Sequence, residues 1–137
     1  MKHLATRISI LVLFASVMLP SGLTKLTGGP TPDWFLKQFS GSLIDIFDGS
    51  LPIQFFAIAV TETALGLLAL GALALSALGR DIQFAMSTLL ISSSLLFTGL
   101  GFGQRITMKF PDAASLFMYA VLSLLLLKVS ETLEEKK

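Results

Sequence analysis

The sequence lacks cysteine altogether and has one histidine, His3, in its 137 residues. The lack of cysteine excludes disulfides, thiolate catalysis and iron–sulfur clusters or metals held by thiolates. With one histidine near the N-terminus, a haem held by two histidines inside the folded chain is excluded too. We find no catalytic residue set, no phosphate loop and no metal-ligand spacing. Any redox role must therefore use a cofactor held without His or Cys, or belong to a partner protein.

Charge is also scarce. Charged residues make up 14% of the chain and leave a formal net charge of +1, whereas 53% of the residues are hydrophobic. The mean hydropathy is +0.80, far from that of a soluble domain. The charge gives no reason to expect nucleic acid as a partner. This length suits one membrane bundle without a soluble catalytic domain, so we expect a single domain over 1–137 with lipid around it.

Four apolar stretches are long enough to cross a bilayer as helices, which takes roughly 20 residues each. We expect these helices at about 6–23, 51–78, 82–102 and 112–130, separated by helix-ending proline, glycine and charged residues. The predicted fold class is all-α integral membrane, a four-transmembrane-helix bundle. The first stretch also resembles a cleavable signal peptide, but no clear small-x-small cleavage site follows it. We therefore expect an uncleaved first helix.

The first loop contains a pattern of its own. Over 33–47, aromatic and aliphatic residues alternate with charged ones, after an Asp33 that can cap a helix. This pattern predicts a short amphipathic helix in the membrane interface, with Trp34 as an anchor at headgroup depth. The alternative is a loop packed over the mouth of the bundle.

Four crossings place both termini on one side of the membrane. The basic residues on that side are Lys2, Arg7, Arg80, Lys128, Lys136 and Lys137, and those opposite are Lys25, Lys37, Arg105 and Lys109. The positive-inside rule then puts both termini in the cytoplasm.

Glu62 lies where a carboxylate is costly. It is the one charge in the stretch from Leu51 to Leu78, about 16 Å from the start of that helix at 1.5 Å per residue. Acids at this depth cost several kcal/mol unless paired or protonated, and they often mark functional sites. Small residues share its helix face, at Ala59, Gly66, Ala69 and Ser76. We therefore expect Glu62 to point into the bundle.

The next helix carries a polar stripe of Ser87, Ser94 and Thr98. We expect these hydroxyls to bond across the interface with the Glu62 helix as helix-packing groups, and some of them to reach the carboxyl.

The partner of Glu62 is left open by the sequence. Arg7 and Lys25 lie about 27 Å apart along the first helix, at opposite membrane faces, and Arg80 shares the Arg7 side. None reaches mid-membrane without bending inward or a water-filled crevice. Without a cation, desolvation favours a neutral Glu62 that could donate a hydrogen bond to a quinone carbonyl or relay protons. A buried ion pair with Lys25 would instead be architectural. The candidate functional or ion-pair residues are Glu62, Lys25, Arg7 and Arg80.

Several short motifs resemble the DoxX family of small membrane proteins. They are Arg7 at the start of the first helix, Gly22-Leu23-Thr24-Lys25-Leu26 at its end, Glu62-Thr63-Ala64-Leu65-Gly66, and Gly71 with Gly79-Arg80. The match covers roughly residues 7 to 80. The resemblance implies a four-helix bacterial inner-membrane protein. Related DoxD-type chains are associated with a thiosulfate:quinone oxidoreductase, and other relatives are membrane partners of redox or oxidative-stress proteins.

Three functions compete. We expect first a non-catalytic membrane subunit that anchors or organises a larger redox complex, with other membrane subunits or copies of itself as partners. The runner-up is a quinone-interacting subunit of a membrane oxidoreductase that uses Glu62, with electrons supplied by a partner. The third is a small proton-coupled transporter, suggested by an acid and a hydroxyl stripe inside a glycine-rich bundle.

Overall fold

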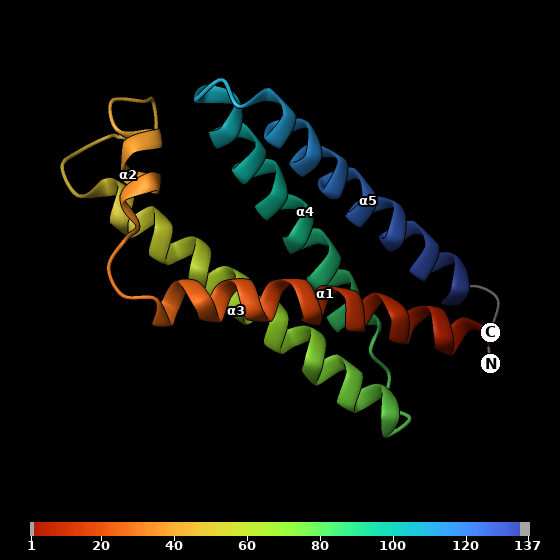
Figure 1. The fold of residues 1–137 in the computed structure, drawn as a ribbon. Helices are drawn as coiled ribbons and strands as arrows, with labels where there is room; N and C mark the ends of the chain where they lie inside the picture. Colours follow the sequence, from red (N-terminus) through yellow and green to blue (C-terminus); the bar gives the residue numbers. More distant parts are fainter. Residues whose placement is uncertain (1, 135–137) are drawn as a thin grey trace.

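The structure of the chain is a computed structural model that describes residues 2–134 (Figure 1). Its helices are α1 (Lys2–Thr27), α2 (Asp33–Phe39), α3 (Ser50–Ala77), α4 (Gln83–Ile106) and α5 (Phe110–Glu134). By length and composition, α1, α3, α4 and α5 can each cross a membrane. The predicted all-α fold with four membrane-spanning helices is confirmed, and the chain is a multi-pass membrane protein.

The helix ends differ from the predicted ones at three places. The first helix continues past 23 to Thr27 with Pro20 inside it, and it ends where Gly28, Gly29 and Pro30 follow. Proline is tolerated within membrane-spanning helices because neighbouring groups satisfy the freed backbone. The first loop is helical over Asp33–Phe39 rather than over 33–47. Asp33 lies in the first turn there instead of capping it, a position that favours acids.

The connection between α4 and α5 is shorter than expected. The helix predicted to end at 102 continues to Ile106, so Gln104 and Arg105 are helical. The next helix begins at Phe110, so Pro111 lies in its first turn, where the missing N–H has no helical partner to lose.

The α1 and α3 helices cross at close range (Figure 1). Glycines make the approach possible. A Cβ at Gly22 would lie 2.9 Å from the Ala59 carbonyl oxygen, and one at Gly66 would lie 2.6 Å from the Cβ of Leu19. Small residues let backbones of membrane helices meet in this way. The close crossing therefore depends on glycine at positions 22 and 66, where a larger side chain would clash with the other helix.

The α4 and α5 helices run antiparallel beside each other (Figure 1). A hydrogen bond from the Ser94 hydroxyl to the Ala120 carbonyl oxygen, 3.1 Å long, joins them. Phe117 of α5 packs against Gly101 of α4. The main buried cluster then joins α1, α3 and α4, with Leu11, Ala69, Met86, Leu89 and Leu90 at its centre.

The short α2 helix packs on the start of α3 through aromatic rings. Phe35 lies between Phe39 and Phe55, with ring centroids 4.7 and 5.0 Å away. Such ring pairs contribute about 0.5–1.5 kcal/mol each beyond their buried area. Gln38 also reaches the end of α4, where its Nε2 donates to Oε1 of Gln104 over 2.8 Å. The α2 helix therefore bridges α3 and α4. This contact agrees with the alternative prediction for the first loop, a segment packed over the mouth of the bundle.

Candidate functional site

The crossing of α1 and α3 brings Lys25 to Glu62. Lys25 lies three residues beyond Gly22, and Glu62 lies three beyond Ala59, which Gly22 contacts. The Lys25 Nζ and the Glu62 Oε2 are 2.6 Å apart. The sequence predicts that Lys25 reaches Glu62 only by bending inward or through a water-filled crevice. In the structure the two side chains meet because α1 extends through Thr27 and its last turns cross the middle of α3. Of the two alternatives for Glu62, the structure shows the ion pair.

Ser21 completes the cluster. Its hydroxyl donates to Oε2 of Glu62 over 2.9 Å and accepts from Nζ of Lys25 over 2.7 Å. Ser21 and Lys25 are four residues apart and share a face of α1. Sequence reasoning missed Ser21. The signal that could have found it is this spacing, a hydroxyl one helical turn before a basic residue.

The two charges are not equally enclosed. The Glu62 side chain is 8% exposed and the Lys25 side chain is 25% exposed. A carboxylate that is this buried requires its cation, because removing one partner of a buried pair leaves an uncompensated charge. The pair therefore joins α1 to α3 at their crossing, and each partner depends on the other for its burial.

The pair does not use all its hydrogen-bonding capacity. An ammonium has three N–H groups, of which the Lys25 bonds to Ser21 and Glu62 occupy two. Both bonds to the carboxylate end on Oε2, and among residues 2–134 we find none on Oε1. One donor and one acceptor therefore remain beside each other.

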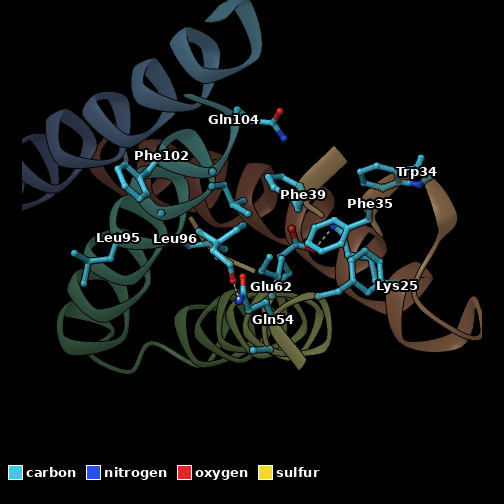
Figure 2. A pocket seen from close by; sticks show the side chains of 17 residues that line it. Lys25, Trp34, Phe35, Phe39, Gln54, Glu62, Leu95, Leu96, Phe102 and Gln104 are labelled. Carbon is cyan, nitrogen blue, oxygen red and sulfur yellow. Dashed lines mark hydrogen bonds and ion pairs between the residues drawn. The ribbon is translucent and has the colours of Figure 1, made fainter. Parts of the chain in front are cut away.

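These groups lie at the wall of a cavity of about 480 Å³. Figure 2 shows how α1, α2, α3 and α4 each contribute side chains to it. Its walls are mostly apolar and aromatic, and its polar side chains are Lys25, Gln54, Glu62 and Gln104, with Trp34 of α2 also lining it. The volume and the few polar groups are typical of a small-molecule site. Gln104 belongs to α4 and lines this cavity.

A second cavity of about 450 Å³ lies between α1 and α5. Glu62 and Leu100 line both cavities. The second one is otherwise nearly all aliphatic and aromatic, with Ser21, Tyr119 and Ser123 as further polar side chains. Both cavities therefore border Glu62, one on the side of Lys25 and the other on the side of α5.

The other predicted polar residues lie elsewhere. Arg7 is buried at 6% exposure, and its Nη2 donates to Oε1 of Gln83 over 3.3 Å, which ties α1 to the start of α4. Arg80 is exposed in the connection between α3 and α4. The structure therefore separates Arg7 and Arg80 from the Lys25–Glu62 pair.

The polar stripe of α4 does not face Glu62 as expected. Ser94 bonds to α5 instead, and the Thr98 hydroxyl donates to the carbonyl oxygen of Ser94 in its own helix. The half-buried Ser87 contributes no bond to the carboxyl. Ser94 therefore acts as a helix-packing group, but toward α5, because α3 packs on α1 at Glu62. Trp34, the predicted interface anchor, is 58% exposed.

Among the described residues, no group of three or more His, Asp or Glu side chains is arranged to hold a metal. Comparison of the chain with protein-family models, curated proteins and solved structures finds no match. The resemblance to the DoxX family accordingly stays a prediction, and function has to be argued from the site.

Proposed function

We propose that this chain is a non-catalytic integral membrane subunit of a larger redox complex, and that it supplies a binding site for a quinone beside Lys25 and Glu62. The observation that carries the proposal is the Lys25–Glu62 pair, which keeps one donor and one acceptor unused and whose two residues line a cavity of about 480 Å³. The DoxX resemblance supports the same class of protein.

The chemistry of the pair suits a quinone ring. The third N–H of Lys25 would donate to a carbonyl oxygen, and Oε1 of Glu62 would accept from the hydroxyl of the reduced form. Hydrogen bonds to charged groups contribute roughly 1.5–3 kcal/mol each. The ring itself would lie among Phe35, Phe39 and Phe55, whose rings line the cavity or its floor.

Electrons would have to come from a partner, since the sequence has no cysteine and one histidine with which to hold a redox centre. In this proposal the chain binds and orients the quinone, and the partner performs the electron transfer. The partner would contact the exposed apolar faces of the helices within the membrane or the α2 side outside it.

The first test is purification in mild detergent from the native membrane, with mass spectrometry of both proteins and lipids. We expect a redox protein and a quinone in stoichiometric amounts with the wild type. Glu62→Gln should keep the protein partner and lose the quinone together with quinone reduction. The matched control is Glu131→Gln, which removes a carboxylate from the exposed Lys128–Glu131 pair.

A chain that purifies alone would contradict the accessory-subunit proposal. If both variants keep the quinone, the assigned site is contradicted. Proton-coupled uptake by liposomes that contain the chain alone would favour the transporter in place of both.

We also propose that the protein lies in a bacterial inner membrane with both termini in the cytoplasm, because six of the ten basic residues fall on the terminal side. The cysteine-free sequence makes the test direct. In intact cells, a membrane-impermeant maleimide should label Ser40→Cys in the first loop and leave Asp81→Cys unlabelled. The reverse pattern would invert the topology.

A further inference from the structure

The second cavity, between α1 and α5, raises the question of what kind of ligand would use both spaces. It has a volume of about 450 Å³ and shares Glu62 and Leu100 with the first cavity. Resting on the proposed function, we infer that it holds the hydrocarbon tail of the quinone whose ring lies beside Lys25. The ligand class is then a tailed quinone rather than a soluble one.

The positions of the two cavities along the helices agree with the two ends of such a molecule. The first cavity includes Lys25 in the last turn of α1 and Gln104 near the end of α4, so it lies toward the end of the bundle that carries α2. The second includes Leu13 and Phe14, about 18 Å further along α1 at 1.5 Å per residue. A polar ring near the interface and a tail directed into the bilayer match this arrangement.

The chemistry of the walls changes in the same direction. The polar side chains of the second cavity besides Glu62 are Ser21, Tyr119 and Ser123, and the Ser123 hydroxyl is bonded to the backbone of its own helix. The other walls are formed by side chains such as Met18, Leu122 and Leu126. Aliphatic walls contact a prenyl chain and require no hydrogen bonds from it. The ring would therefore be selected in one cavity and the tail in the other.

The second cavity is also open toward the surrounding lipid. Tyr119 and Leu122 are 52% and 47% exposed although they line it. A ligand dissolved in the bilayer could thus enter sideways between α1 and α5 without crossing the polar ends of the helices.

Lipid and the cavity wall are equally apolar, so a tail gains little hydrophobic free energy by moving from one to the other. The site must act through shape. A side chain that fills the cavity should therefore weaken binding of a tailed quinone, while binding of the ring alone is unchanged.

The test uses a benzoquinone with a saturated tail that ends in a photoreactive diazirine, bound to the full chain in nanodiscs. Labelled positions are mapped by mass spectrometry, with an untagged tailed quinone as competitor. We expect competable labels on the α1 and α5 walls, at Met18, Leu122 or Leu126. The labels could instead be confined to outward-facing positions such as Leu125, while the untagged quinone still competes for the ring site. This result would overturn the tail site and leave the proposed function standing.

A pair of variants makes the result quantitative. Leu122→Trp should weaken the binding of the tailed quinone by roughly tenfold or more, because the larger side chain overfills the site. It should leave the affinity for a tail-free quinone unchanged. Leu125→Trp, on the same helix but outside the cavity, should change neither. Equal affinities of Leu122→Trp and Leu125→Trp for the tailed quinone would contradict the tail site. Absence of competable binding by any quinone would overturn the proposed function along with it.

Discussion

The two helix pairs of this bundle are held together in different ways. In the α1–α3 pair, backbones meet at Gly22 and Gly66, and a Lys25–Glu62 ion pair closes the crossing. In the α4–α5 pair, Phe117 packs against Gly101 and the Ser94 hydroxyl donates to the Ala120 carbonyl oxygen. The first pair therefore combines backbone contact with a charged contact, whereas the contacts named for the second pair are uncharged. The cavities lie between the pairs, and the charged side chains that line them, Lys25 and Glu62, come from the first pair.

The largest effect should follow from removing the cation of the first pair. Lys25→Met leaves the Glu62 carboxylate buried without its partner, which should cost roughly 3–5 kcal/mol of unfolding free energy. Denaturation in mixed lipid–detergent micelles measures this. Lys128→Met is the matched control, because it breaks an exposed pair 3.7 Å long and should cost about 1 kcal/mol or less.

Removing the acid instead should cost less. After Glu62→Leu, the Lys25 side chain is 25% exposed near a helix end and can turn its ammonium toward water. The same denaturation assay should therefore rank Lys25→Met below Glu62→Leu in stability, and the opposite order would show that the carboxylate is the better solvated partner.

Next in size is the loss of close backbone contact. Gly66→Ala places a methyl group 2.6 Å from the Cβ of Leu19, and should destabilise the fold by roughly 1–3 kcal/mol. Gly71 in the same helix has open space where a Cβ would lie, with nothing within 4 Å, so Gly71→Ala should be neutral or gain up to about 1 kcal/mol. Similar unfolding free energies for the two variants would mean that α1 and α3 do not cross at Leu19.

The smallest effect should come from the α4–α5 pair. Ser94→Ala removes its interhelical bond, and such bonds average about 0.6 kcal/mol in membrane proteins. Thr98→Ala, whose hydroxyl bonds within α4, provides the control and should cost no more. A Ser94→Ala cost above that of Gly66→Ala would reverse the contrast between the two pairs.

The sequence predicts the helices better than it predicts their contacts. Hydropathy and helix-breaking residues locate four spans, and the small residues around Glu62 correctly indicate a buried face at Ala59, Gly66 and Ala69. The predicted end of the first helix at 23 is wrong because the helix continues through the polar residues up to Thr27, and the predicted start at 112 is wrong because Pro111 is accepted in the first turn of α5.

Pairing between helices is a property of the packed bundle. The sequence puts Lys25 at the membrane face because distance along one helix says nothing about the angle at which another helix crosses it. The expected neighbour of Ser94 is wrong for the same reason, since periodicity shows that a stripe is buried but not which helix covers it. Ser21 is neither apolar nor charged, so its role is recognised once the positions of Lys25 and Glu62 are known.

The central claim, that the Lys25–Glu62 pair binds a quinone, is tested most directly with Lys25→Met/Glu62→Leu. Removing both charges strands neither, so this double variant should fold with stability close to that of the wild type. Its affinity for a tail-free quinone in nanodiscs, measured by equilibrium titration, should fall by roughly tenfold or more because the hydrogen bonds to charged groups are lost. A folded double variant that binds the quinone as tightly as the wild type would contradict the claim and leave the ion pair as a purely structural link between α1 and α3.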